Sequence, residues 1–175
     1  TVTSAPTEAV SDADVIVLVI PAQHMREALA AFDVPPGIPL VCAAKGIELS
    51  SGKTMSAVLQ ELLPGNPVAM LSGPSFASET AAGKPTALTL AAAEGDLALT
   101  LADALRTGTF RPYASTDVVG TEVGGAVKNV LAIAAGIVSG IGMGENARAA
   151  LITRGLAEAS RFAVALGGRA DTLMG

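Results

Sequence analysis

The sequence predicts an α/β protein in which a doubly wound parallel sheet is followed by a helical region. Short apolar runs rich in β-branched residues alternate with segments of helical periodicity as far as residue 116, and this alternation is typical of βαβ units. The runs are apolar almost throughout, as strands are when helices cover both faces of their sheet. From residue 117 onward no strand-like run is bounded by turn signals, so the rest of the chain is expected to be helical.

The expected elements follow this alternation in order. Strands are predicted at residues 14–20 (DVIVLVI), 39–43 (PLVCA), 67–71 (PVAML), 86–90 (TALTL) and 110–114 (FRPYA). Helices are predicted between them at residues 23–32, 54–63 and 94–106, where apolar residues recur at three- and four-residue spacing. Two long helices follow, at about residues 117–141 and 147–166, the second ending at a Gly-Gly pair. The domain boundary is placed near Ser115, which gives domains at 1–116 and 117–175.

Composition and charge exclude several classes of function. The net charge is −5 and no cluster of Lys and Arg is interleaved with aromatic residues, so nucleic acid is not an expected partner. His24, the only histidine, has no cysteine or carboxylate at metal-ligand spacing, so no metal is expected. The apolar stretch 130–144 is shorter than the ~20 residues of a membrane span and contains several glycines, so no span is expected.

The single cysteine and the first residues favour a cytoplasmic location. Cys42 has no second cysteine with which to form a disulfide, and its setting in PLVCAA is that of a buried strand position. The first residues, TVTSAPTEA, lack the basic segment and apolar stretch of a signal peptide. A reducing compartment is therefore expected.

The first candidate for chemistry is AAKGIE, which directly follows the second predicted strand. Open α/β sheets bind ligands at the carboxyl ends of their strands, so Lys45 is expected at the mouth of that crevice. An ammonium group there can meet a phosphate or a polarised carbonyl oxygen. The alternative is a solvated loop lysine without a function.

The second candidate is SGPSFASE, which follows the third predicted strand. Gly73 allows close approach of the backbone, and Pro74 fixes the turn. Ser75 lies where the next helix would expose unpaired N–H groups, which attract anionic or polar ligand atoms. The alternative is that Ser75 only caps that helix, with Ser78 or Glu79 completing its first turn.

The third candidate is GGAVKNVLAIAAG, in which one lysine and one amide interrupt a run of small and apolar residues. Lys128 follows Val127 of the apolar helix face and so points to a different side. If it faces a cleft of low polarity near a second cation, its neutral form is favoured and it can act as a general base. Asn129 beside it could orient a substrate hydroxyl or carbonyl. The alternative is a lysine that extends along the helix to solvent.

Together these segments resemble the bacterial NAD(P)-dependent glycerol-3-phosphate dehydrogenases. The similar segments are VIVLVIPAQHMREAL, AAKGIE, LSGPSFASETAAGKPTA and GGAVKNVLAIAAGIVSGIGMGENARAALITRGLAE, in the family's order and at about its spacing. The resemblance implies a partial Rossmann-type domain joined to an all-helical domain of the 6-phosphogluconate dehydrogenase C-terminal type.

The resemblance also implies a reaction. It is the reversible reduction of dihydroxyacetone phosphate to sn-glycerol 3-phosphate, with NADP or NAD as cofactor, which supplies glycerol 3-phosphate for phospholipid synthesis. By resemblance, Lys128 is the proton acceptor when the alcohol is oxidised, and Lys45 contacts both the substrate and the nicotinamide. Both lysines are thus expected to bind substrate.

Further binding residues are implied by the same resemblance. Gly73 and Ser75 are expected to bind the substrate, and Ala77 and Pro21 the cofactor. The expected partners are a small phosphorylated substrate and a second copy of the chain in a homodimer.

Two parts of the family's pattern are not found in the sequence. No strand followed by G-x-G-x-x-G precedes the sheet, and the later helical region that supplies an aspartate beside the base and an Arg-Asn pair for the phosphate is absent. We therefore expect these residues to be either the middle of a longer protein or a genuine fragment, and on their own to bind cofactor poorly and to turn over little or nothing. The alternatives are another reductase of the same superfamily and a catalytically inactive Rossmann-type binding module.

Overall fold

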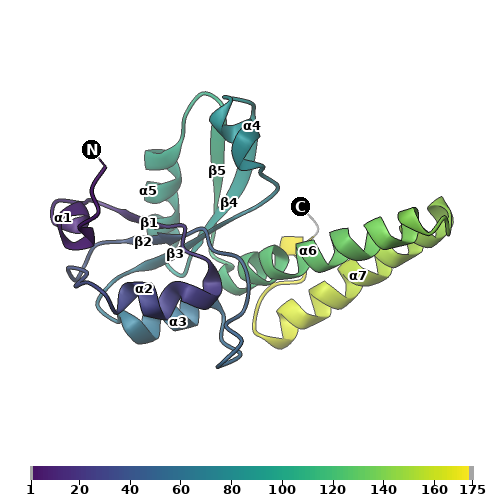
Figure 1. Cartoon of the computed structure of the whole chain (residues 1–175), viewed down its shortest axis with the longest axis horizontal. Coiled ribbons are helices and arrows are strands. Elements are labelled where there is room, and N and C mark those ends of the chain that lie inside the picture. The colour runs from purple at the N-terminus through teal and green to yellow at the C-terminus, as the bar shows by residue number, and fades with distance from the viewer. Residues whose placement is uncertain (1, 174–175) are drawn as a thin grey trace.

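The computed structural model describes residues 2–173 as a five-stranded sheet with helices on both faces, from which a long helical hairpin projects (Figure 1). The strands are β1 (Ile16–Leu18), β2 (Leu40–Cys42), β3 (Val68–Ser72), β4 (Thr86–Ala92) and β5 (Phe110–Ser115), and they lie in this order across the sheet. The helices are α1 (Pro6–Val10), α2 (Met25–Leu29), α3 (Met55–Leu62), α4 (Ala77–Ala81), α5 (Gly95–Leu105), α6 (Val118–Gly140) and α7 (Glu145–Ala165), with short 3-10 helices η1 (Ala22–His24) and η2 (Asp171–Leu173).

The α/β class followed by long helices is confirmed, and every strand and helix predicted above is present with bounds shifted by a few residues. The helix predicted from residue 23 is divided, because η1 occupies its first turn and α2 begins only at Met25. The short helices α1 and α4 were not predicted as elements with bounds, since five residues give too little periodicity to detect.

The prediction of a fully parallel sheet is wrong at one pair of strands. β3 and β4 pair antiparallel, with Ser72 opposite Thr89, whereas the other neighbouring strands pair parallel. A parallel return needs a crossover segment that packs across a face of the sheet, usually a helix. Between β3 and β4 the chain forms only the five-residue α4, which has no buried residue, so the chain turns back beside β3.

Each face of the sheet has its own core. Leu40 and Cys42 of β2 point to the face covered by α2 and α3, where they pack with Met55. Val41, between them, points to the opposite face and packs with Leu90 beneath α5, as the alternation of side chains along a strand requires. Cys42 is fully buried, as predicted, and burial raises the pKa of its thiol to about 11.

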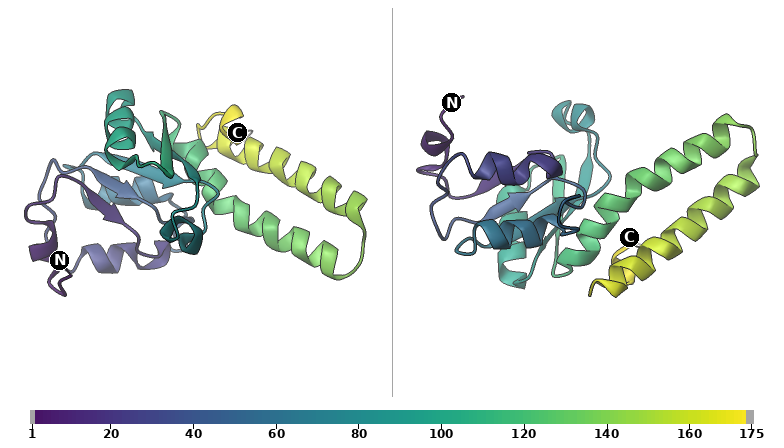
Figure 2. Two further views of the ribbon diagram at one scale, coloured as in Figure 1. Left: turned by 90° about the horizontal axis from the view of Figure 1, so that it is seen from above. Right: turned by 60° about the horizontal axis from the view of Figure 1, so that its bottom comes forward.

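The hairpin of α6 and α7 extends away from the sheet, and its helices run side by side (Figure 2). Gly155 of α7 lies against Leu131 of α6, so closely that a Cβ at residue 155 would collide with that leucine side chain. Further along α6, Val130, Ile133 and Ile137 are exposed. Their spacing places them on one side of the helix.

By length and composition, α6 is the one helix among residues 2–173 that could cross a membrane. Its first two turns are nevertheless buried within the protein, and they include the carboxylate of Glu122. The rest of α6 projects from the sheet with α7 beside it, and only 17% of its most apolar window is buried.

Asp117 fixes the start of α6 and joins it to the end of the described chain. Its side chain accepts hydrogen bonds from the backbone N–H of Gly120 at 2.9 Å and of Arg169 at 2.9 Å, and from the Thr172 hydroxyl at 2.5 Å. Burial opposes ionisation of this carboxyl group, but the three hydrogen bonds outweigh that effect and lower its pKa. The segment that contains η2 is thereby held beside the first turn of α6.

Candidate active site

The loops that follow β1, β2 and β3 lie at one edge of the sheet, because these three strands are parallel. Pro21 comes from the first loop, Lys45 from the second and Gly73 from the third. The first half of α6 packs against β3, so its side chains reach the same edge. This arrangement matches the crevice that open α/β sheets use for ligands.

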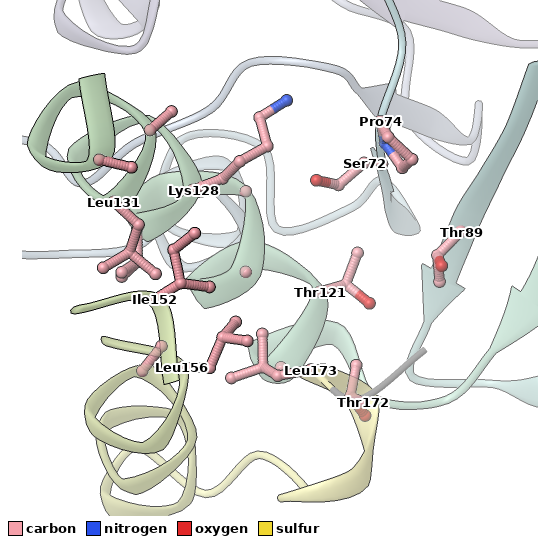
Figure 3. A pocket seen from close by; sticks show the side chains of 18 residues that line it. Ser72, Pro74, Thr89, Thr121, Lys128, Leu131, Ile152, Leu156, Thr172 and Leu173 are labelled. Carbon is pink, nitrogen blue, oxygen red and sulfur yellow. The ribbon is translucent and has the colours of Figure 1, made fainter. Parts of the chain in front are cut away.

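A cavity of about 500 Å³ opens between the end of β3 and the helical hairpin. Figure 3 shows that Lys128, Ser72 and Pro74 lie at one end of it, and that apolar side chains from α6, α7 and η2 lie at the other. The lining residues are Ser72, Gly73, Pro74, Thr89, Gly120, Thr121, Gly124, Gly125, Val127, Lys128, Leu131, Ala132, Ala135, Ile152, Leu156, Ala159, Thr172 and Leu173. A polar end beside an apolar chamber can hold a small ligand in one orientation.

Two lysines lie close together near the polar end: Lys128 lines the cavity, and Lys45 lies beside it, behind Ser72 and Gly125. The Lys45 ammonium donates a hydrogen bond to the backbone carbonyl oxygen of Gly73 at 3.3 Å. Burial lowers the pKa of Lys45, and the positive charge of the nearby Lys128 lowers it further. The structure thus brings together the lysines of two sequence segments that lie far apart in the chain.

The backbone at Gly73 is suited only to glycine. Its φ is +153°, and a Cβ there would lie 2.9 Å from Leu88 Cδ2 and 3.1 Å from Leu88 Cα. The chain can therefore turn sharply at the end of β3 while remaining in contact with β4. This turn aims the Gly73 carbonyl group at Lys45.

Gly125 lets α6 approach the sheet closely. A Cβ at this position would lie 2.6 Å from Ser72 Oγ and 3.6 Å from Lys45 Cγ. Lys128 is three residues further along the helix, on the neighbouring position of the same ridge. The close approach at Gly125 therefore determines how near Lys128 lies to Lys45.

We expect Gly125→Ala to destabilise the chain by about 1–3 kcal/mol, because the added methyl group overpacks the contact with Ser72. The same displacement should move Lys128 and lower turnover. Gly136→Ala is the matched control, since a Cβ there meets nothing within 4 Å and alanine favours a helix by about 1 kcal/mol. Urea denaturation of both variants measures the difference, and equal stabilities would contradict the role given to Gly125.

The Lys45 loop is held by side chains from α2 and η1. Gln23 donates to the Ile47 carbonyl oxygen at 2.8 Å and accepts from the Leu49 N–H at 3.0 Å. Arg26 pairs with the buried carboxylate of Glu48 at 2.7 Å. These contacts fix the backbone on the C-terminal side of Lys45.

The other candidate residues lie near this edge or apart from it. Pro21 is exposed at the start of η1, and Ala77 is exposed at the start of α4. Asn129 is exposed on α6 and is not among the residues that line the cavity. His24 is exposed, with its Nδ1 atom 3.8 Å from a Glu27 carboxylate oxygen. Within residues 2–173 no group of three His, Cys, Asp or Glu side chains could hold a metal ion.

Ser75 is not the N-cap of α4, so that alternative reading of the segment is wrong. Phe76 occupies the N-cap position without a side-chain hydrogen bond, and Ala77 is the first helical residue. The turn at Gly73 and Pro74 delays the helix by one residue. Ser75 is half-buried in the loop before it.

Sequence reasoning missed Glu122, which is buried beside the Lys45 loop. Its carboxylate accepts from the Ser56 backbone N–H at 2.7 Å and from the Ser56 hydroxyl at 2.5 Å. Burial raises the pKa of Glu122, although hydrogen bonds from Ser56 oppose the rise. The signal was available, because Glu122 is an acid within the same small and apolar helical run as Lys128.

A sheet covered on both faces, with loops at its carboxyl edge and a helical region that adds a lysine to a cavity there, is typical of the class of α/β enzymes that bind ligands at this edge of the sheet. Comparison with known families agrees with this class. Residues 1–98 match the NAD-dependent glycerol-3-phosphate dehydrogenase N-terminus, and residues 117–175 match the C-terminus of the same enzyme. The chain belongs to the NAD-dependent glycerol-3-phosphate dehydrogenase family, which confirms the resemblance seen in the sequence.

Individual relatives agree with this membership. The glycerol-3-phosphate dehydrogenase (NAD(P)+) of Rhodospirillum rubrum is 58% identical over 96% of this chain and 49% of its own length, and that of Paramagnetospirillum magneticum is 57% identical over 94% and 61%. The crystal structure of the Coxiella burnetii enzyme superposes with a TM-score of 0.89 at 36% identity, covering 97% of this chain and 52% of its own. The Saccharomyces cerevisiae enzyme gives a TM-score of 0.87 at 28% identity, covering 97% and 52%. The chain spans about half the length of most of these relatives.

Proposed function

We propose that this chain carries the catalytic lysines of an enzyme that interconverts dihydroxyacetone phosphate and sn-glycerol 3-phosphate, with NADP or NAD as cofactor. The observation that carries the proposal is that Lys45, which donates to the Gly73 carbonyl oxygen, lies close to Lys128, which lines the cavity together with Gly73. Family membership supplies the reaction and the cofactor.

In the direction of reduction, hydride for the carbonyl carbon of the substrate is the chemistry that a bound nicotinamide cofactor would supply. The C=O bond becomes a C–O bond, and negative charge develops on the oxygen. The Lys128 ammonium stabilises that charge and then transfers a proton to the oxygen, which completes the hydroxyl group. In the direction of oxidation, the Lys128 amino group would accept the hydroxyl proton, and uptake of the hydride is the chemistry that the oxidised cofactor would supply.

Lys45 and its loop complete the proposed binding site. The second positive charge favours an anionic substrate, and its hydrogen bond to Gly73 holds the ammonium toward the crevice. Gly73 and Ser75 are proposed to bind the substrate beside it. Asn129 would have to act from outside the cavity lining, which makes it the weakest of the proposed catalytic residues.

The residues present fit one end of a dinucleotide. Pro21, Lys45 and Ala77 follow three strands whose carboxyl ends are at one edge of the sheet, where the nicotinamide end of such a cofactor binds. The half-buried Lys45 and the exposed Pro21 and Ala77 leave polar and apolar surface for it. The chain has no G-x-G-x-x-G segment, so no residue is assigned to the pyrophosphate.

The proposal extends to domain organisation and assembly. The boundary near Ser115 falls between β5 and α6 and between the two family matches, which supports domains at 1–116 and 117–175.

The exposed apolar side of α6 supports association with a second copy. The buried thiol of Cys42 is compatible with a cytoplasmic protein. Sedimentation of the complete protein would give its oligomeric state.

The test of the reaction is an assay of the complete protein with dihydroxyacetone phosphate and NADH or NADPH. We expect loss of the absorbance of the reduced cofactor, and its appearance when sn-glycerol 3-phosphate and the oxidised cofactor are supplied. A panel of other small oxo acids and phosphates is the comparison. Turnover of one of these, without turnover of dihydroxyacetone phosphate, would favour another reductase.

A chimera tests the residues of this chain directly. In it, the chain replaces the matching segment of the Rhodospirillum rubrum relative, which supplies the remainder of the protein. We expect the chimera to retain turnover. A folded but inactive chimera would favour the inactive binding module instead.

A further inference from the structure

We propose that Glu122 is a positioning residue, which links α6 to the start of α3 and thereby holds Lys128 and Lys45 together. The inference rests on the proposed function, because it gives Glu122 a role through those two lysines. The argument starts from the hydrogen bonds at the first turn of α3.

The first turn of α3 is capped by a residue of another helix. Thr54 is the N-cap of α3, but its side chain makes no capping hydrogen bond. Glu122 of α6 instead accepts from the Ser56 N–H and from the Ser56 hydroxyl. A carboxylate at this position satisfies N–H groups that the helix leaves unpaired, and its charge complements the helix dipole.

The same turn of α3 is connected to the Lys45 loop. Ile47 forms an antiparallel bridge with Thr54, and the Glu48 N–H donates to the Lys53 carbonyl oxygen at 2.9 Å. Lys45 lies two residues before the bridge. Glu122 therefore binds the turn of α3 to which the backbone on the C-terminal side of Lys45 is paired.

On its own helix, Glu122 begins a ridge that ends at Lys128. Residues 122, 125 and 128 are spaced by three, so they are successive neighbours along α6. Glu122 contacts α3, Gly125 lies against Ser72 and Lys45, and Lys128 lies close to Lys45. The ridge places α6 relative to both loops of the site.

Burial of a carboxylate lowers the stability of a protein, so a buried carboxylate suggests that its position serves a purpose. Glu122 is 7% exposed and has no basic partner among its hydrogen bonds, so burial of its charge is unfavourable except for the hydrogen bonds that it accepts. An apolar residue could fill the space but could not fix one arrangement of α6 on α3. The requirement for a defined arrangement explains the choice of glutamate.

The decisive variants are Glu122→Ala and Glu122→Gln in the complete protein. We expect Glu122→Ala to lower kcat by about 10–100-fold, because a small displacement of a catalytic group is that damaging, and to raise KM for the substrate, because Lys45 is proposed to bind it. Glu122→Gln should restore kcat to within about threefold, since an amide accepts from the Ser56 N–H and donates to its hydroxyl oxygen. Glu158→Ala, which removes an exposed carboxylate of α7, is the control.

A spectroscopic readout separates positioning from general stability. The Cε signal of Lys45, followed by carbon NMR during titration of this chain, reports the pKa that burial and Lys128 now lower. In folded Glu122→Ala we expect that pKa to rise toward the ordinary lysine value, and in Glu122→Gln to remain low. If Glu122→Ala does not fold, Glu122→Asp replaces it, because the shorter carboxylate keeps the charge but loses the reach to Ser56.

The proposal is overturned if the folded variant that lacks the Ser56 contact keeps both its kcat and the lowered pKa of Lys45. It is also overturned if Glu122→Gln restores neither kcat nor the lowered pKa of Lys45. The NMR result does not depend on the substrate. A complete protein without activity on dihydroxyacetone phosphate would therefore refute the proposed function. The positioning role of Glu122 would still be tested by the pKa of Lys45 measured by NMR.

Discussion

Replacement of Lys128 by alanine is expected to lower kcat of the complete protein by about 10²–10⁴-fold, the range typical for loss of a general acid or base. The reason is that Lys128 is the one ionisable side chain among the described residues that line the cavity. Because Lys128 is exposed on α6, the stability of the chain should change by no more than about 0.5 kcal/mol. Initial rates with the reduced cofactor, together with thermal unfolding, measure both effects.

The matched control for Lys128 is Lys84. This lysine is also exposed and forms an ion pair with Glu79 outside the cavity lining, so Lys84→Ala should leave kcat unchanged. Near-normal turnover of Lys128→Ala would remove Lys128 from the mechanism. A loss of turnover in both variants would show that general electrostatics, and not proton transfer, is responsible.

Asp117→Ala is expected to have the largest effect on stability, with a loss of about 3 kcal/mol in the free energy of unfolding. The variant loses an N-cap hydrogen bond of α6, which contributes about 1 kcal/mol. It also loses two hydrogen bonds that hold Arg169 and Thr172, and each bond to a charged group contributes about 1.5–3 kcal/mol before non-additivity. Urea denaturation of this chain measures the loss.

The contribution of Asp117 to the stability of the chain is expected to change with pH in a defined direction. Because the folded-state pKa of Asp117 is below its ordinary value of 3.8, its contribution is present above that value and is lost as pH falls through the folded-state pKa. The difference between the wild type and Asp117→Ala should therefore shrink in acid. Asp171→Ala, which removes an exposed ion pair with Arg169, should cost less than about 1 kcal/mol. Equal losses in the two variants would contradict the role of Asp117.

Much of the fold was predictable because its signals are local. Apolar runs and helical periodicity depend on neighbouring residues, and they identified the strands around Val41 and Leu90 and both helices of the hairpin. The direction of β4 was not predictable in this way. It depends on whether the segment between β3 and β4 packs on the sheet, which is a property of tertiary structure.

The residues of the candidate site that belong to sequence motifs could be predicted. Those whose role depends on contacts between distant parts of the chain could not. The segments around Lys45, Gly73 and Lys128 were found from their position after strands or within a helix, and the structure brings them together. The contacts of Asp117 with Arg169 and of Glu122 with Ser56 were not found, because these partners lie 52 and 66 residues away along the chain, although an acid in the apolar run around Glu122 was itself a signal. Their hydrogen bonds exist only after the helical region has packed on the sheet.

The cap that Glu122 provides has a consequence for folding cooperativity. The first turn of α3 belongs to the sheet domain, yet one of its backbone N–H groups is satisfied by a residue of the helical region. The free energy of α3 therefore includes a contribution that appears only when α6 docks. The segments on the two sides of the proposed boundary near Ser115 are therefore expected to be thermodynamically coupled through this contact.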